Sequence, residues 1–254
     1  MASEIITSPQ NVRVQRLRRL SAESSRSEEW FLLEGGTLLE EAFSSGWDID
    51  SLYYTDSVSL PETVSRYQIS ERLMRSITSL ESAPTVIAIA RKKLLPIEDI
   101  EPGRLSLLLD SVQDPGNVGT LLRSAAAFGA AAVLSTRGTV HFYNPKVVRA
   151  SMGGMFKLQL CEQVTEKDVS VLLRRTGAEL VVADSRAGAA PASISSAGCI
   201  LALGHETEGV SPGLRKLASR GVRIPMRKTT ESLNVAVAGS ILLYEMARIL
   251  QVAE

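Results

Sequence analysis

Three short segments of this 254-residue chain place chemically capable side chains directly after predicted strands. In the first segment, residues 114–123, Asn117 and Arg123 stand in a glycine-containing turn that leads into a helix. Glycine lets a backbone approach a ligand closely, and the free amide groups at a helix start attract phosphate. The Arg123 side chain is long enough to reach back to the same place. An ordinary helix cap followed by a solvated arginine explains these residues equally well.

The second segment, residues 203–212, holds two glycines that bracket a loop in front of a helix. Its carboxylates, Glu206 and Glu208, stand near that helix start, where the helix dipole favours negative charge, so one of them could be only a cap. His205 offers a general base in the same loop. We disfavour that role because the sequence places no partner for the imidazole nearby.

The third segment, residues 224–238, concentrates hydroxyls, an amide and two cations where the last helix of the chain begins. Ser232 could cap that helix, and Asn234 could satisfy a neighbouring loop. Capping accounts for each residue separately, but it does not account for their clustering. The three segments are therefore candidate parts of one site.

Common nucleotide-binding motifs and metal sites do not fit this sequence. Residues 116–119, Gly-Asn-Val-Gly, lack the third glycine of a dinucleotide-binding fingerprint, which argues against a nicotinamide oxidoreductase. The sequence also lacks a Gly-x-x-x-x-Gly-Lys-Ser/Thr phosphate loop. Two cysteines, Cys161 and Cys199, and two histidines are too few for a zinc cluster. We predict no metal, and a reducing compartment.

The elements that must position the three segments alternate between strand and helix. Such alternation predicts an α/β fold, with a mostly parallel sheet covered by helices on both faces. Ligands of such sheets bind beyond the carboxyl ends of the strands. We predict strands at 105–109, 131–134, 180–183, 200–203 and 222–224, helices at 118–128, 167–175 and 235–252, and a further helix beginning at Pro212.

The N-terminal part predicts a smaller α/β domain. Residues 96–103 contain prolines and charges in place of a periodic pattern, which is typical of a linker. We therefore divide the chain into domains at 1–95 and 104–254. Within the first domain we predict helices at 12–19, 37–44 and 71–78 and strands at 52–54 and 86–90.

The balance of 28 basic and 28 acidic side chains hides an uneven distribution. Residues 1–100 carry 11 basic and 15 acidic groups, a net charge of −4, whereas residues 101–254 carry 17 and 13, a net charge of +4. Binding to a polyanion depends on Lys and Arg, so any such affinity would be local. No apolar run approaches the roughly 18 to 20 residues of a membrane span. Residues 1–10 lack the apolar core of a secretory signal.

Taken together, the three segments resemble the signature motifs of the SpoU (TrmH) family of RNA ribose 2′-O-methyltransferases, in the SPOUT superfamily. The resemblance covers residues 105–254, and it depends on the order and spacing of the motifs. These are Asn117-x-Gly119-x-x-x-Arg123, then Gly204-x-Glu206-x-x-Gly209, then Ile224-Pro225-Met226 followed by Ser232-Leu233-Asn234-Val235. Two departures lie outside the motif residues: Gly239 stands one place earlier than in many members, and His205 replaces a small or amide residue.

The resemblance implies transfer of a methyl group from S-adenosylmethionine to a ribose 2′-hydroxyl. Backbone groups of Gly204, Ile224, Met226 and Leu233 would hold the cofactor. A guanidinium has a pKa above about 12 and is a poor base, so Arg123 would anchor an RNA phosphate and stabilise the developing alkoxide. The residues that would orient substrate and arginine are Asn117, Glu206, Ser232 and Asn234. The proton acceptor stays open.

The resemblance also implies a C-terminal trefoil knot and an N-terminal substrate-binding domain related to ribosomal protein folds of the L-thirty-e type. We expect a structured RNA substrate, with ribosomal RNA favoured over transfer RNA, and a cytoplasmic enzyme, with an organellar matrix as the alternative. We expect a homodimer that packs through Ile241, Leu242, Met246 and Ile249.

RNA affinity should be concentrated around Arg123, Arg227 and Lys228 and on the early arginines Arg16, Arg18 and Arg19, although a solvated helix face explains these last three as well. Two alternatives to a ribose methyltransferase stay open: a catalytically silent RNA-binding homologue, and a SPOUT enzyme that methylates a base. Asn117 and Arg123 together favour the ribose enzyme.

Overall fold

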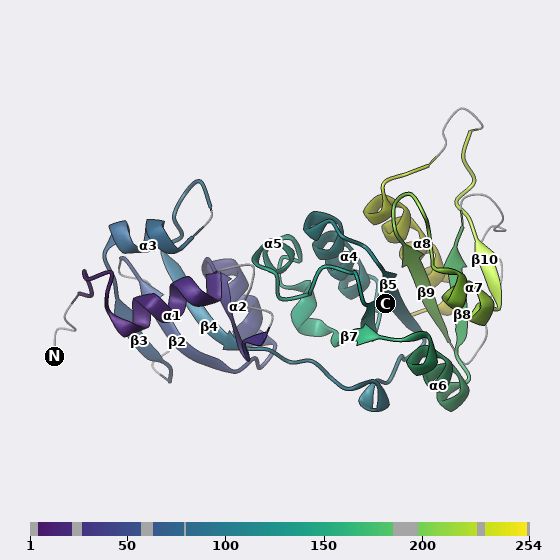
Figure 1. Cartoon of the computed structure of the whole chain (residues 1–254), viewed down its shortest axis with the longest axis horizontal. Helices are drawn as coiled ribbons and strands as arrows, with labels where there is room; N and C mark the ends of the chain where they lie inside the picture. Colours follow the sequence, from purple (N-terminus) through teal and green to yellow (C-terminus); the bar gives the residue numbers. More distant parts are fainter. Residues whose placement is uncertain are drawn as a thin grey trace.

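The computed structural model of the chain describes residues 5–21, 27–56, 63–78, 80–184, 198–227 and 232–252. Two sheets lie one after the other along the longest axis, with the N-terminal sheet on the left of Figure 1 and the larger sheet on the right. Within these ranges no helix is long and apolar enough to cross a bilayer. The prediction of two α/β units agrees with this arrangement.

The smaller unit is a four-stranded mixed sheet in the order β1-β4-β2-β3. Strand β4 runs antiparallel to both β1 and β2, whereas β2 and β3 are parallel. Apolar side chains of α1 and α3 bury one face of this sheet, and α2 packs on the other. The elements are α1 (Val12–Ser21), β1 (Trp30–Glu34), α2 (Gly36–Ser44), β2 (Ile49–Tyr54), β3 (Ser65–Gln68), α3 (Glu71–Ile77) and β4 (Val86–Arg91).

The larger unit is a six-stranded parallel sheet in the order β10-β8-β9-β5-β6-β7. Central strand β5 is buried along its whole length, as its continuous apolar sequence predicts. The strands are β5 (Leu105–Asp110), β6 (Ala132–Thr136), β7 (Gln159–Val164), β8 (Glu179–Ala183), β9 (Cys199–Gly204) and β10 (Arg220–Val222).

Helices cover both faces of the parallel sheet, which confirms the predicted architecture. Alternate side chains of β5 point to opposite faces: Leu107 and Leu109 join the core under α4, α5 and α8, and Leu108 joins the core under α6 and α7. The helices are α4 (Pro115–Ala127), α5 (Pro145–Ala150), α6 (Glu166–Thr176), α7 (Pro212–Leu217) and α8 (Val235–Leu250).

Some elements differ from the sequence predictions. Strand β7 was not predicted because Gln159, Glu162 and Gln163 interrupt its apolar pattern, and β7 lies at the sheet edge, where one side is less buried. Helix α5 is only six residues long, too short for a helical pattern to be recognised. Strand β10 ends at Val222, two residues before its predicted end, so Ile224 leaves the sheet.

The two units pack closely against each other through α5 and β1. Arg149 of α5 pairs with Glu34 of β1 at 3.0 Å, and the Glu34 side chain is only 5% exposed. Ring contacts extend this interface, with centroid separations of 4.6 Å for Phe31 with Tyr143 and 4.9 Å for Trp47 with Phe156. The smaller unit is therefore held in a fixed position relative to α4 and α5.

Helix α8 changes the prediction of which residues form the homodimer contact. Of the four residues predicted to form a dimer contact, Leu242 and Met246 are 2% and 0% exposed because they fill the core of their own chain. The outer face of α8 instead carries Val237, Ile241 and Tyr244. The trefoil knot stays a prediction, since segments 185–197 and 228–231 lie outside the described residues.

Candidate active site

Hydrogen bonds bring the three predicted segments into direct contact. Asn117 is the centre of this cluster: its side-chain amide donates to Glu206 Oε1 at 3.1 Å, and its carbonyl accepts from Asn234 Nδ2 at 3.0 Å. These partners lie 89 and 117 residues away along the chain. One residue from each segment therefore contributes to a single polar chain, Asn234 to Asn117 to Glu206.

A helix cap fixes the orientation of the Asn234 side chain. Asn234 is the N-cap of α8, and its carbonyl accepts from the backbone amides of Ala236 and Val237 at 2.9 and 3.2 Å. Its amide group is thereby left to face Asn117. The alternative in which Ser232 caps this helix does not hold, because Asn234 is the N-cap and the helix begins at Val235.

The start of α4 does not offer the phosphate site that its glycines suggested. Asp114 is the N-cap, and its carboxylate accepts from the Asn117 backbone amide at 2.8 Å, so a negative charge already occupies this helix start. Gly119 serves helix packing: a Cβ there would lie 2.4 Å from Ala150 Cβ of α5. The segment therefore positions Asn117, and its glycine permits close contact between α4 and α5.

The loop after β9 is closed on itself. A Cβ on Gly204 would lie 2.1 Å from the backbone of Gly209, so this position accepts only glycine. His205 and Gly209 exchange two backbone hydrogen bonds, of 3.2 and 2.8 Å, and the His205 imidazole contacts Thr207 within the loop at 3.1 Å. These contacts leave Glu206 exposed at the tip of the turn, directed toward Asn117.

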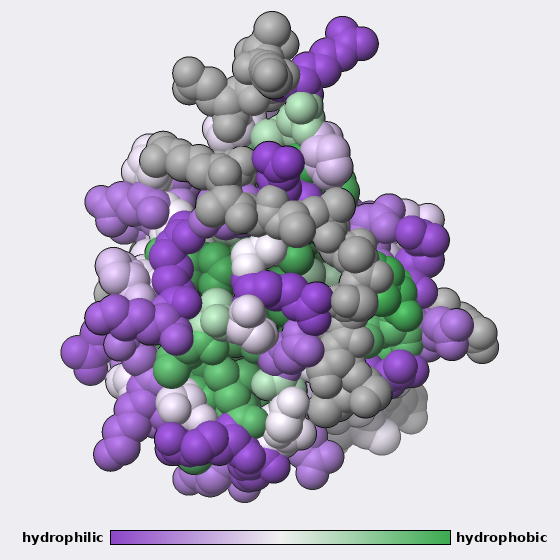
Figure 2. All heavy atoms as spheres, turned by 90° about the vertical axis from the view of Figure 1, so that its right-hand side faces the viewer, coloured by the Kyte–Doolittle hydropathy of each residue, from purple (hydrophilic) through white to green (hydrophobic). Residues whose placement is uncertain are grey.

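Beside this loop lies a pocket of about 140 Å³ at the carboxyl ends of β8, β9 and β10. All four residues predicted to hold the cofactor line it, namely Gly204, Ile224, Met226 and Leu233, as do Glu206 and Ser232. Figure 2 looks at this end of the molecule and shows apolar atoms recessed among hydrophilic side chains.

The pocket fits the chemistry of S-adenosylmethionine. Its apolar lining, which includes Leu203, Val222 and Leu242, suits a flat adenine ring. The closed loop at Gly204 brings backbone groups to the pocket wall with no side chain between. Asp184 and Arg223 also line the pocket. They supply one negative and one positive charge, which suit the amino group and the carboxylate of the methionine part of the cofactor.

Two acidic residues that the sequence did not single out hold these loops in place. Asp110, at the end of β5, is 4% exposed and accepts from the Ser211 amide and the Thr136 hydroxyl, both at 2.7 Å. Asp184, directly after β8, pairs with Arg215, which also donates to the Val210 carbonyl at 2.8 Å. The sequence signal that could have identified Asp110 and Asp184 is their position at the end of a buried strand or directly after it.

Arg123 occupies a different place from the other predicted catalytic residues. Its side chain is exposed on α4, does not line the pocket, and makes no hydrogen bond or ion pair with the residues that the structure describes. It stands six residues after Asn117, about 9 Å further along the helix axis. Its backbone packs against Gly154, where a Cβ would lie 2.9 Å from Arg123 Cα. The guanidinium is thus available to a ligand.

The cysteines take no part in this site. Burial raises the pKa of the Cys161 thiol to about 11 and that of the Cys199 thiol to about 12, so both stay protonated at neutral pH. Among the described residues, no three His, Cys, Asp or Glu side chains are grouped as metal ligands. Lys228 lies outside the described residues.

Comparison with known proteins identifies the family. Residues 104–244, more than half of the chain, match the model of the SpoU rRNA Methylase family. The chain belongs to the SpoU family. Residues 11–88 match the MRM3-like substrate binding domain. The predicted resemblance is confirmed, and the chain is an S-adenosylmethionine-dependent RNA 2′-O-methyltransferase.

Relatives of this SpoU protein resemble it over nearly its whole length. The 23S rRNA (guanosine(2553)-2′-O)-methyltransferase RlmP of Bacillus subtilis is 30% identical, over 95% of this chain and 98% of its own. An AdoMet-bound rRNA methyltransferase structure from Sinorhizobium meliloti has a TM-score of 0.86 at 28% identity, covering 98% of both chains. The AdoMet complex of AviRb from Streptomyces viridochromogenes has a TM-score of 0.82 at 27% identity, covering 94% of this chain and 98% of its own.

Proposed function

We propose that this protein methylates the 2′-hydroxyl of one nucleotide in ribosomal RNA, and that the segments around Asn117, Glu206 and Asn234 form its active site. The hydrogen-bonded chain of these three side chains beside the pocket is the observation that carries the proposal. RlmP and a further relative from Streptomyces viridochromogenes are named as 23S rRNA 2′-O-methyltransferases, which supports this RNA class over transfer RNA. Such a substrate would place the enzyme with the ribosomes, in the cytoplasm.

The proposed division of labour follows from the chemistry of each group. Bound S-adenosylmethionine supplies an electrophilic methyl group. Backbone groups around Gly204 and Leu233 hold the cofactor. The hydrogen-bonded side chains of Asn234, Asn117 and Glu206 orient the ribose. Arg123 binds the phosphate next to the target nucleotide and stabilises negative charge on the 2′-oxygen as its proton leaves. Alignment of the two reacting groups contributes much of the rate.

The domain assignment belongs to the same proposal. Residues 1–95 bind the RNA, residues 96–103 connect the units, and residues 104–254 carry the cofactor and the chemistry. The ion pair between Glu34 and Arg149, together with the ring contacts around it, supports a substrate-binding unit that is held in register with α4.

We also propose a homodimer that uses the outer face of α8. Val237, Ile241 and Tyr244 are 49%, 39% and 51% exposed, and they stand at helical spacing on one side. Contiguous apolar side chains on a surface helix mark a contact site. This face replaces the buried Leu242 and Met246 of the original expectation.

One experiment tests the methylation itself. The protein is incubated with methyl-labelled S-adenosylmethionine in two reactions. One contains unmodified transfer RNA, and the other contains unmodified 23S ribosomal RNA. The labelled RNA is then digested to nucleosides. We expect label only in the ribosomal RNA, on a 2′-O-methylated nucleoside. Label on a base would identify a base methyltransferase, and RNA binding without label would identify a silent homologue; either result contradicts the proposal.

A further inference from the structure

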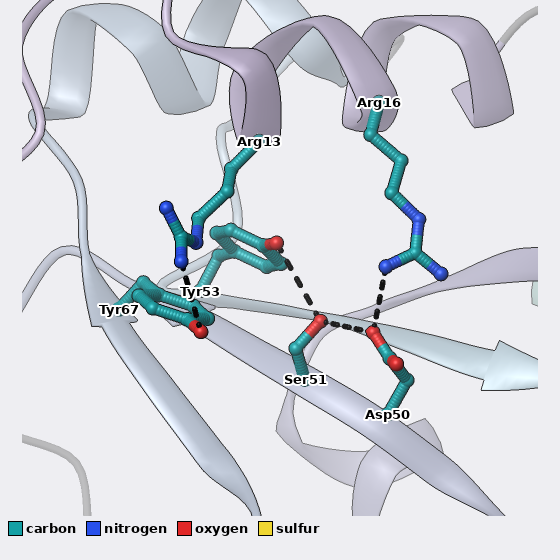
Figure 3. Close-up of polar contacts among 6 residues, drawn as sticks. All are labelled: Arg13, Arg16, Asp50, Ser51, Tyr53 and Tyr67. Carbon is teal, nitrogen blue, oxygen red and sulfur yellow. Dashed lines mark hydrogen bonds and ion pairs between the residues drawn. The ribbon is translucent and has the colours of Figure 1, made fainter.

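A second open groove lies at the far end of the molecule from the cofactor pocket. It has a volume of about 680 Å³ and lies between α1 and the strands β2 and β3 of the smaller unit. Figure 3 shows its polar side chains, with Arg13 and Arg16 reaching down from α1 toward residues of the sheet. The opposite face of α1 is anchored in the core by Val14, Leu17 and Leu20, so the helix carries its arginines on a fixed support.

Arg13 lies over an aromatic ring. Its guanidinium lies 4.3 Å from the centroid of the Tyr67 ring, and Nη2 donates to the Tyr67 hydroxyl at 3.4 Å. The ring and the hydrogen bond hold one side of the guanidinium. The side chain is exposed, and no carboxylate within the described residues pairs with it. Its charge is therefore available to a ligand in the groove.

Arg16 is oriented by a polar chain in the groove floor. It donates to Asp50 Oδ2 at 2.8 Å, and the same oxygen accepts from the buried Ser51 hydroxyl at 2.8 Å. The Ser51 hydroxyl also contacts the hydroxyl of buried Tyr53. Asp50 balances the charge of Arg16 but leaves its remaining donors available, since the Arg16 side chain is 32% exposed. Arg19, paired with Glu28 at 2.9 Å, completes the wall.

We propose that this groove binds a phosphate and an adjacent unpaired base of the substrate RNA, with Arg13 as its principal contact. The inference rests on the proposed function and assigns one RNA subsite to the smaller unit. The Arg13 guanidinium can donate to a phosphate, and unpaired RNA bases stack on arginine and aromatic side chains such as Arg13 and Tyr67, which line the groove together. Removing Arg13 weakens this contact directly, whereas Arg16 has its charge balanced by Asp50.

The position of the groove determines what its loss should do. Strand β3 and helix α1 lie at one end of the longest axis in Figure 1, and strand β10, which borders the cofactor pocket, lies at the other. One nucleotide cannot occupy both places on the same chain. The groove therefore binds RNA remote from the methylated ribose, and its residues should affect KM and not kcat.

Arg18 offers a matched control on the same helix. The sequence pattern grouped Arg18 with Arg16 and Arg19 as a candidate RNA contact. Its guanidinium instead donates to the Ser76 hydroxyl of α3 at 3.0 Å and does not line the groove, so the present inference assigns it no RNA contact. The variants Arg13→Gln and Arg18→Gln remove the same charge a short distance apart. Tyr67→Leu removes the ring under Arg13, and thermal unfolding of each variant checks that the fold is kept.

The test measures filter binding of each full-length variant to transcribed 23S ribosomal RNA over a range of salt concentrations. We expect Arg13→Gln and Tyr67→Leu to raise Kd by about tenfold, and Arg13→Gln to reduce the slope of log Kd against log salt by about 1. Arg18→Gln should leave both close to wild type. With labelled cofactor, Arg13→Gln should raise KM in proportion and preserve kcat.

Two outcomes overturn the inference: equal effects of Arg13→Gln and Arg18→Gln, which indicate general charge attraction, and an Arg13→Gln variant with wild-type Kd. A fall in kcat with unchanged KM also contradicts it. Failure of the proposed function has a different signature, since wild-type protein would then bind the RNA without methylating it. The comparison of Kd values between the variants still tests whether the groove binds RNA in that case.

Discussion

The side-chain amide of Asn234 donates a hydrogen bond to the side-chain carbonyl of Asn117, with 3.0 Å between Nδ2 and Oδ1. Because the Asn234 carbonyl is already engaged by the first amides of α8, only its NH₂ group can face Asn117. Asn117 must then turn its own NH₂ group toward Glu206. The cap of one helix thus sets the orientation of an amide on another helix. Through that amide it also orients the Glu206 carboxylate beside the proposed cofactor pocket.

Asn234→Asp should separate catalysis from stability. Aspartate caps a helix as well as asparagine does, so the free energy of unfolding should change by less than about 0.5 kcal/mol. The new carboxylate cannot donate to Asn117, which would turn its amide toward Asp and leave Glu206 without a donor. We expect methyl transfer to fall at least tenfold in a steady-state assay.

Ser70→Ala is the control for loss of a cap. Ser70 caps α3, where its hydroxyl accepts from the Leu73 amide, far from the pocket. It should cost about 1 kcal/mol of stability and leave methylation unchanged. Full activity of Asn234→Asp would show that the hydrogen bond between Asn234 and Asn117 has no catalytic role.

Arg123→Ala should strongly reduce methylation without affecting the fold. The side chain is exposed and has no partner among the described residues, so the free energy of unfolding should stay within about 0.5 kcal/mol of wild type. Loss of charge stabilisation at the 2′-oxygen should lower kcat by about 10² to 10³. Cofactor affinity, measured by calorimetry, should be unchanged. Arg174→Ala, at an exposed position on α6, is the matched control. Near wild-type turnover of the Arg123 variant would refute the assignment.

Gly204→Ala should close the proposed cofactor pocket. The added methyl group would lie 2.1 Å from the backbone of Gly209, which cannot move without opening the loop that carries Glu206. We expect the affinity for S-adenosylmethionine to fall below detection by calorimetry, with a stability loss of about 1 to 3 kcal/mol. Gly36→Ala, at the first residue of α2 with open space around it, should keep the wild-type cofactor affinity and stability. Normal cofactor binding by Gly204→Ala would contradict the placement of the pocket.

Ile241→Arg should dissociate the proposed dimer. A charge in the middle of the outer face of α8 would have to be buried in the contact, which is costly. We expect wild-type protein to scatter light as a dimer at micromolar concentration and the variant as a monomer. Val171→Arg provides the control, because Val171 is 44% exposed on α6, on the other face of the sheet. A monomeric wild-type protein would disprove the dimer, and a dimeric Ile241→Arg variant would place the contact elsewhere.

Local sequence pattern was sufficient for most of the larger unit. The apolar run that became β5 predicted a strand buried on both faces, and the structure buries all six of its residues. The alternation of such runs with helical segments predicted a parallel sheet. The helix predicted at 167–175 is α6, which ends at Thr176, where Gly177 follows in a left-handed conformation at φ 70°. Strand β7 was missed because side chains at a sheet edge need not be apolar.

The sequence by itself determined which residue types belong to the site, because Asn117, Glu206 and Asn234 stand in three motifs that keep their order and spacing. Only the tertiary structure decided that these three touch. Their contact depends on β9 lying beside β5 with Asp110 opposite Gly204, although the two strands are separated by three others along the chain. Strand order results from long-range packing of helices on both faces, and no local pattern of residues encodes it. For the same reason, only the fold showed that Leu242 and Met246 fill the core while Tyr244 faces outward.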